Sequence, residues 1–190
     1  MKKSTLTFLG RDSGFGRENN AVYTEIDEKL LIIDCGFTVF EKLKERLNLE
    51  EYKEIHVIIT HLHNDHAGSL SQLILYIYFI YNKKINIISK CKRIKEYLEI
   101  TGTPREAYTL QEKNEYVEII KTEHTKYLDA YGCKLKIKGK TIIYTGDTNT
   151  LEPYRQYLKE ANELYVDVSK FRRSSSKNRR YRRRIEEYKE

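Results

Sequence analysis

The chain has 190 residues, a length that fits one domain of ordinary size with a substantial hydrophobic core. Its net charge of +7 is confined to one segment, because residues 170–190 hold ten Lys or Arg and three Glu. The 25 basic and 25 acidic residues before this segment cancel, so a basic face for nucleic acid on the body of the protein is not implied.

Cysteine usage and hydropathy point to a cytoplasmic protein. Cys35, Cys91 and Cys133 are scattered and form no Cys-x-x-Cys pair, which indicates free thiols in a reducing compartment. The most apolar stretch, residues 69–80, is too short for a membrane span, and the first residues show no signal-peptide pattern.

The hydrophobic pattern predicts a mixed α/β chain. Strands are expected over residues 6–9, 21–26, 30–33, 55–60, 85–89, 116–121, 132–137, 141–145 and 164–168. Helices are expected over residues 37–47, 70–81, 91–100 and 151–161. The run 55–60 is almost continuously β-branched, which indicates a buried strand with parallel neighbours. Residues 102–115 are polar, and we interpret them as a lid or an interface loop.

Residues 60–69, Thr-His-Leu-His-Asn-Asp-His-Ala-Gly-Ser, concentrate metal-ligand side chains directly after that strand. Imidazole nitrogen and carboxylate oxygen are ligands that zinc and similar divalent metals prefer. Alternate side chains of an extended segment share one side, so His61 and His63 can converge on one ion. Asp65 and His66 follow as the chain turns and can reach a second ion. A histidine-rich surface loop is the alternative interpretation.

This segment resembles the His-x-His-x-Asp-His signature of the metallo-β-lactamase-fold hydrolases, and the resemblance extends from about residue 4 to residue 169. It implies an αββα sandwich. It also implies a third histidine ligand, which matches His124 in Lys-Thr-Glu-His-Thr, and a bridging aspartate, which matches Asp147 in Tyr-Thr-Gly-Asp-Thr. In the family, a carboxylate at the place of Asp34 orients the metal loop, although a turn-capping aspartate fits this position equally well.

The resemblance therefore implies two divalent metal ions, zinc or manganese, that lower the pKa of a shared water to make a nucleophile. The expected ligands are His61, His63, Asp65, His66, His124 and Asp147. The family's last histidine, which follows the final strand, is absent from this sequence. Of five histidines only His56 is left over, and it lies about 16 Å before His61 along the same strand. We expect the second metal to be under-coordinated.

Residues 170–190 are expected to form a basic, disordered tail behind a metallo-hydrolase domain at residues 1–169. The tail segment Arg-Arg-Ser-Ser-Ser-Lys-Asn-Arg can be encoded so that reading one nucleotide later gives Gly-Gly-Val-His-Leu-Lys-Ile. One hypothesis is thus a frameshift that removed the final ligand, which sequencing of the gene would test. A basic arm that binds nucleic acid is the functional alternative.

Within the family, the Asn-Asn-Ala-Val-Tyr, Asp-Cys-Gly and Tyr-Thr-Gly-Asp-Thr segments are most similar to the tRNA 3′-processing branch. The short chain and its Tyr-Val-Asp-Val-Ser-Lys-Phe segment resemble the anti-Pycsar phosphodiesterases. That resemblance implies a homodimer in the host cytoplasm that hydrolyses cyclic mononucleotides and counteracts an antiviral defence. Tyr108 and Tyr116 are the expected contacts to the base. The alternatives are an RNA 3′-end endonuclease and a nucleotide-binding protein weakened by the missing ligand.

Overall fold

The structure is a computed structural model that describes residues 4–168. The basic segment 170–190, with the hypotheses attached to it, lies outside the described residues. The larger sheet contains, in spatial order, β1 (Thr7–Gly10), β2 (Ala21–Ile26), β3 (Lys29–Ile33), β4 (Glu54–Ile58), β5 (Ile85–Ile88) and β6 (Tyr108–Gln111). The smaller sheet contains β10 (Glu163–Tyr165), β9 (Lys140–Tyr144), β8 (Ala130–Ile137) and β7 (Val117–Thr122).

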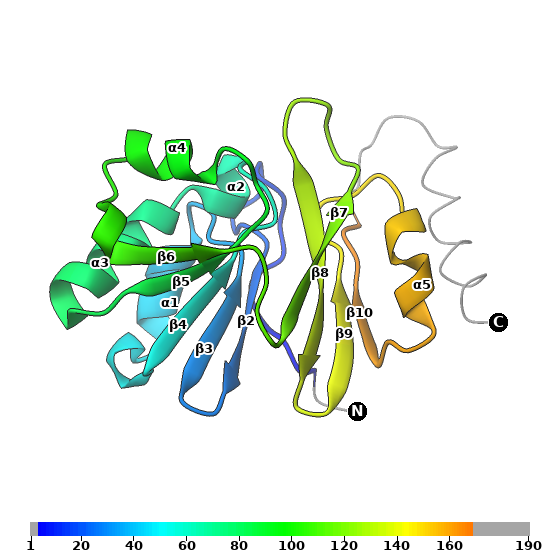
Figure 1. Cartoon of the computed structure of the whole chain (residues 1–190), viewed down its shortest axis with the longest axis horizontal. Coiled ribbons are helices and arrows are strands. Elements are labelled where there is room, and N and C mark those ends of the chain that lie inside the picture. The colour runs from blue at the N-terminus through cyan, green and yellow to red at the C-terminus, as the bar shows by residue number, and fades with distance from the viewer. Residues whose placement is uncertain (1–3, 169–190) are drawn as a thin grey trace.

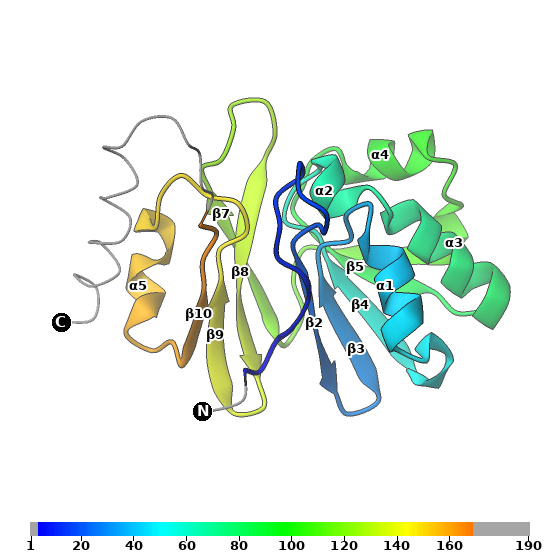
Figure 2. The ribbon, with the colours of Figure 1, turned by 180° about the vertical axis from the view of Figure 1, so that it is seen from behind.

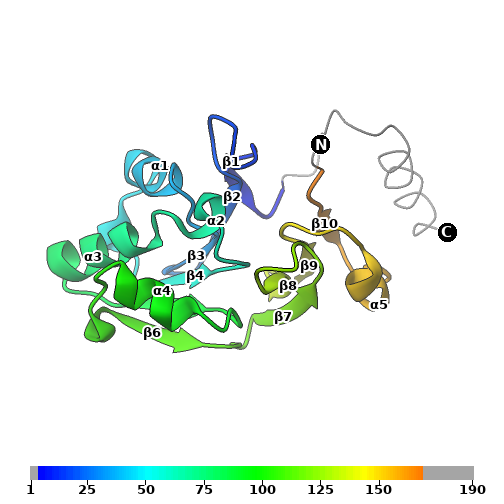
Figure 3. The same cartoon turned by 90° about the horizontal axis from the view of Figure 1, so that it is seen from above.

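The two sheets face each other, and helices cover their outer faces (Figures 1 and 2). The helices are α1 (Val39–Arg46), α2 (Asn64–Ala67), α3 (Leu70–Tyr81), α4 (Ile94–Ile100) and α5 (Arg155–Leu158), with 3-10 turns η1 (Leu49–Glu51), η2 (Arg105–Ala107) and η3 (Glu152–Tyr154). Helices α1, α3 and α4 lie outside the larger sheet and α5 outside the smaller one (Figure 3). The predicted αββα sandwich is confirmed.

Strand β4 lies inside the larger sheet and pairs in parallel with β3 and β5, as its continuous apolar run predicts. Ile55, Val57 and Ile58 on this strand are almost completely buried. Because β3, β4, β5 and β6 all run in the same direction, their carboxyl ends meet at one edge of the sheet. The metal-ligand segment after β4 therefore starts at that edge.

Two expectations for local structure are wrong. Residues 102–115 are not a lid but contain η2 and the edge strand β6, which pairs in parallel with β5. An edge strand beside solvent tolerates the polar composition that suggested a loop. The helix expected over residues 151–161 consists only of η3 and the four-residue α5.

Helix α3 spans residues 70–81 as predicted, but its apolar character is only partly explained by the core. Leu70, Leu73 and Ile74 are fully buried, whereas Phe79 and Ile80 near its end are 67% and 61% exposed. None of the helices among residues 4–168 is long and apolar enough to cross a lipid bilayer.

The carboxylate of Glu163, at the start of β10, joins the segment before β1 to the smaller sheet. It accepts hydrogen bonds from the Thr5 N–H at 3.0 Å, the Thr5 hydroxyl at 2.6 Å and the Lys140 ammonium at 2.6 Å. The Tyr165 hydroxyl donates a further bond at 2.8 Å. Burial opposes ionisation here, but these donors prevail and lower the pKa of Glu163 to about 2.

We predict that Glu163→Gln lowers the free energy of unfolding at pH 7 by about 1 kcal/mol, since the charge-assisted bonds are partly exposed. The folded-state pKa lies below the unfolded value of about 4.3, so this stabilisation is present above that pH and is lost as the pH falls towards 2. Urea unfolding of both proteins between pH 7 and pH 3 should show the difference shrinking. Glu41→Gln, on the exposed surface of α1, serves as the control; a pH-independent difference for Glu163→Gln would refute the assignment.

Candidate metal centre

Three loops at one edge of the sandwich carry the predicted ligands. Residues 61–66 follow β4 and include the first residues of α2, His124 follows β7, and Asp147 follows β9. Figure 3, which views the molecule from above, shows α2 facing the smaller sheet at this edge. The structure brings all six predicted ligand residues together there, while ligation itself stays a prediction.

His61, His63 and His124 form the first group of the centre. Each offers a ring nitrogen, and these atoms lie within 4.8 Å of one another. The Nδ1 atom of His63 is 2.9 Å from His61 Nε2 and 3.3 Å from His124 Nε2. Three converging imidazoles are the donor set of a three-histidine zinc site, so the residues fit the metal that the sequence implies.

The surroundings of His61 and His124 keep these two rings neutral, which is the protonation state that a metal ligand requires. Burial lowers the pKa of His61 to about 2 and also lowers the pKa of His124, so both rings are neutral at pH 7. The Thr60 hydroxyl donates to Asp34, and it therefore accepts from Nδ1–H of His61, which lies 3.1 Å away. This tautomer leaves Nε2 of His61 free of a proton and directed at the cluster.

The second group consists of His61, His66 and Asp147, with Asp65 beside it. His66 Nε2 is 3.3 Å from Asp147 Oδ1 and 3.4 Å from Asp65 Oδ2. The other Asp147 oxygen, Oδ2, lies 3.5 Å from His124 Nε2 and 4.0 Å from His61 Nε2. Asp147 thus directs one oxygen at each group, which is the arrangement of a bridging carboxylate.

Charges within the second group act strongly on one another. The hydrogen bond with His66 is the main reason why the pKa of Asp65 falls to about 2. Burial opposes protonation of His66, but Asp34, Asp147 and Asp65 together raise its pKa well above the ordinary value. A cation that binds His66 therefore displaces a proton, because a ligating imidazole must be neutral.

Asp34 supports the metal loop from behind and is completely buried. The Thr60 N–H and the Thr60 hydroxyl donate to its Oδ1 at 2.9 Å, and its Oδ2 lies 2.8 Å from His66 Nδ1. These contacts match the orienting role that the family resemblance implies, and they go beyond those of a turn cap. Nε2 of His66 is left to face the cluster.

Tyr108 and Tyr116, the predicted base contacts, are not brought to the cluster. Tyr108 is 5% exposed and pairs with Ile85 at the beginning of β5, the end opposite to the metal loop. Tyr116 precedes β7, whereas His124 follows the other end of this strand, about 20 Å away. His56, on β4, pairs with Glu54 at 2.9 Å and is also outside the cluster.

Sequence reasoning missed three residues on loops that contact or carry the cluster, namely Phe15, Tyr127 and Asp167. An added Cβ atom at Gly14 would lie 2.9 Å from the Asp65 carboxylate, so the loop between β1 and β2 packs directly on the Asp65 side chain. The next residue, Phe15, is 99% exposed, and Tyr127, three residues after His124, is 81% exposed. An aromatic residue between two loop glycines, Gly14 and Gly16, was the available signal for Phe15.

Asp167 is the third missed residue and follows β10 at the same edge. Its backbone N–H donates to the Thr145 hydroxyl at 3.2 Å. Burial and the nearby Asp147 carboxylate raise the pKa of Asp167 to about 6. The signal for this residue was its position after a strand that parallels β9.

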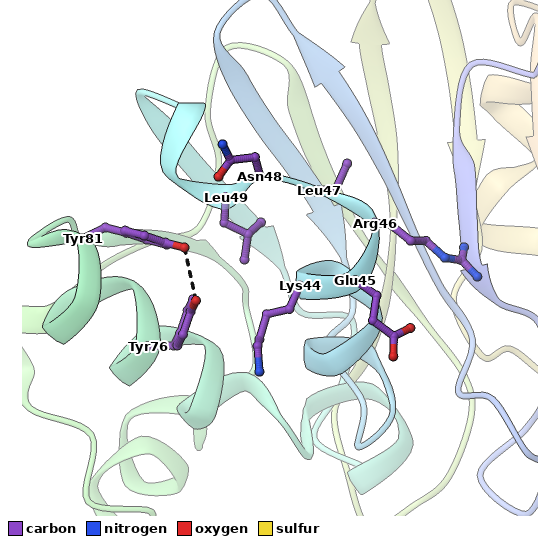
Figure 4. Close-up of a pocket in the computed structure, with 8 residues that line it drawn as sticks. All are labelled: Lys44, Glu45, Arg46, Leu47, Asn48, Leu49, Tyr76 and Tyr81. Atoms are coloured by element: carbon purple, nitrogen blue, oxygen red, sulfur yellow. Dashed lines mark hydrogen bonds between the residues drawn. The ribbon is translucent and has the colours of Figure 1, made fainter.

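A hollow of about 450 Å³ lies away from the metal centre, between the end of α1 and the end of α3 (Figure 4). The Tyr76 and Tyr81 hydroxyls are 3.2 Å apart there, and the Lys44 ammonium lies 5.6 Å from the Tyr76 ring centre. The eight residues drawn in Figure 4 include none of the predicted ligands, so this hollow is separate from the site.

Solved structures share the fold. The metallo-β-lactamase fold protein YhfI from Bacillus subtilis has a TM-score of 0.74 and 16% sequence identity over 90% of this chain and 74% of that one. Human tRNase Z, short form, has a TM-score of 0.66 and 19% identity over 84% of this chain and 75% of that one. At these identities the likeness concerns the fold alone.

Proteins with similar sequences identify the family to which the chain belongs. An "Anti-Pycsar protein Apyc1" of Bacillus phage 010DV004 is 26% identical over 176 residues, which cover 75% of this chain and 68% of that protein. The family model "Anti-Pycsar protein Apyc1" matches residues 4–98, half of the chain, and includes Asp34 and the ligands at 61–66. His124 and Asp147 lie beyond this match. The chain therefore belongs to the Anti-Pycsar protein Apyc1 family.

Proposed function

We propose that this protein is a metal-dependent phosphodiesterase that hydrolyses cyclic mononucleotides to nucleoside monophosphates and thereby counteracts a cyclic-nucleotide antiviral defence. The observation that carries the proposal is the placement of Asp147, whose two oxygens face two different groups of nitrogen ligands. Membership of the anti-Pycsar family supports the choice of substrate and of biological role.

The proposal divides the predicted ligands between two divalent ions, zinc or manganese. His61, His63 and His124 would hold the first ion, Asp65 and His66 would hold the second, and Asp147 would bridge them. When bound, two such ions stabilise charge on phosphate oxygens and lower the pKa of water. The protein's own part is to fix the rings: Thr60 sets the His61 tautomer, and Asp34 orients His66.

A nucleobase would require a stacking surface beside the metals, and two exposed rings on loops at the cluster are suited to that role. Phe15 lies on the loop that packs against Asp65, and Tyr127 lies on the loop that carries His124. Aromatic rings stack on bases of any sequence, which suits several cyclic nucleotides. We assign base stacking to these rings in place of Tyr108 and Tyr116.

We predict that His63→Ala abolishes hydrolysis, because the first group loses one of its three nitrogen donors. The rate should fall at least about 100-fold, measured by chromatography of nucleoside monophosphates from a cyclic-nucleotide panel with added zinc or manganese, and with a chelator. His56→Ala, the one histidine variant outside the cluster, is the control and should retain activity.

The same assay separates the alternatives. Hydrolysis by His63→Ala at the wild-type rate would disprove the site. Tight nucleotide binding by the wild type without turnover would identify the weakened binder, in line with the absent final histidine. Cleavage of precursor RNA but of no cyclic nucleotide would identify the endonuclease.

We predict that Phe15→Ala and Tyr127→Ala each raise KM for a cyclic nucleotide by about 5-fold or more and leave kcat within about 3-fold. Loss of base stacking costs about 1–3 kcal/mol, and both side chains are too exposed to support the core. Phe79→Ala removes an exposed ring from α3 and is the matched control. An unchanged KM in both loop variants would remove these rings from the substrate site.

We also infer a cytoplasmic homodimer, supported by the family resemblance and by exposed apolar side chains. Phe79 and Ile80 on α3 and Ile100 on α4 are 67%, 61% and 82% exposed. Charged substitution of both Phe79 and Ile80 to Asp should convert a dimer to a monomer in sedimentation equilibrium, because burying a carboxylate in an interface is costly. A wild-type protein that sediments as a monomer would contradict the inference.

A further inference from the structure

The turn after Asp147 is tied by hydrogen bonds to the loop that carries His124. The backbone N–H of Asn149 donates to the Glu123 carbonyl at 2.7 Å, and its side-chain amide donates to the carbonyl of His124 itself. One residue therefore holds two consecutive carbonyls of a loop that lies 25 residues earlier in the sequence.

A second contact joins the same two segments of the chain through buried hydroxyl groups. The hydroxyls of Thr122, at the end of β7, and Thr148 are hydrogen-bonded and almost fully buried. Thr148 donates to the Thr150 carbonyl at 2.7 Å, so its bond with Thr122 has Thr122 as the donor. The turn after Asp147 is therefore held to the end of β7 by the buried Thr122–Thr148 hydrogen bond and to the His124 loop by the exposed Asn149.

The two loops also meet on the ligand side. Asp147 Oδ2 lies 3.5 Å from His124 Nε2. His124 is thus held at its carbonyl by Asn149 and faces Asp147 with its ring, and both partners come from one turn. Strand β8 lies between β7 and β9 in the sheet, so sheet hydrogen bonds do not join these two loops directly.

We propose that Asn149 is a positioning residue that fixes His124 relative to Asp147 and so couples the two metal groups. The inference rests on the metal-binding part of the proposed function and not on its substrate. The Asn149 side chain is exposed, so its hydrogen bond serves the placement of a loop and not the packing of the core. Partners that orient metal ligands typically contribute 10–100-fold in metal affinity.

The test is a zinc titration of the metal-free protein, with calorimetry or a competing chromophoric chelator as the readout. Asn149→Ala should weaken binding of the first ion by about 10-fold or more. Asn149→Asp keeps the size but replaces the amide donor with an acceptor, so it should weaken binding equally. Asn149→Gln keeps a donor and should recover affinity to within about 3-fold of the wild type.

Asn48→Ala is the matched control, because this exposed asparagine bonds to Glu51 at 2.8 Å in the loop after α1. Unfolding midpoints of all metal-free variants should agree with the wild type. Equal zinc affinity in the wild type and Asn149→Ala overturns the inference, and so does an affinity loss that only follows a lowered midpoint. A wild type that binds no divalent ion overturns the proposed function together with it.

Discussion

One buried carboxylate, Asp34, is the constraint on which the metal loop depends. It follows β3 in a left-handed conformation, with φ of 65°, which an aspartate tolerates better than most residues. This conformation turns the carboxylate towards the end of the neighbouring parallel strand, where Thr60 donates two hydrogen bonds and His66 lies 2.8 Å away. Without it, a buried N–H and a buried imidazole would lose their acceptor, at a cost of about 1–3 kcal/mol for each group.

Thr60 extends this constraint from one sheet to the other. Its N–H bonds to Asp34, and its carbonyl accepts from the N–H of Tyr131, near the start of β8, at 3.0 Å. Gly146 approaches Thr60 closely enough that an added Cβ would lie 3.2 Å from its side chain, and its φ of 56° favours glycine. Gly146, the residue before Asp147, is therefore packed against Thr60, the residue before His61. The centre forms where the two sheets meet, and the fold determines its geometry.

The sequence is most informative where the chemistry is local. The spacing of His61 and His63 predicts their convergence, because alternate side chains of an extended segment share one side. Asp65 and His66 follow on α2, where the chain turns, as their position in the same short segment indicates. His124 and Asp147 have no such local pattern, and only the order of motifs in a known family pointed to them. The choice of Tyr108 failed because composition does not distinguish an edge strand from a lid, nor one end of a strand from the other. Phe15 was missed because its relation to Asp65 depends on a packing contact across fifty residues.

The second group differs from the first in its donor atoms, because it adds carboxylate oxygens to imidazole nitrogen. Asp65, His66 and Asp147 supply three donors, the number that catalytic zinc sites commonly use, and two of them are carboxylates that offset the charge of a divalent ion. Affinity at this group is opposed, however, by the proton that Asp34, Asp147 and Asp65 hold on His66. In the first group, burial lowers the pKa of both His61 and His124, so these two rings have no proton to displace at pH 7. A divalent ion at His66 would therefore have to compete with a proton, whereas an ion at His61 and His124 would meet rings that are already neutral.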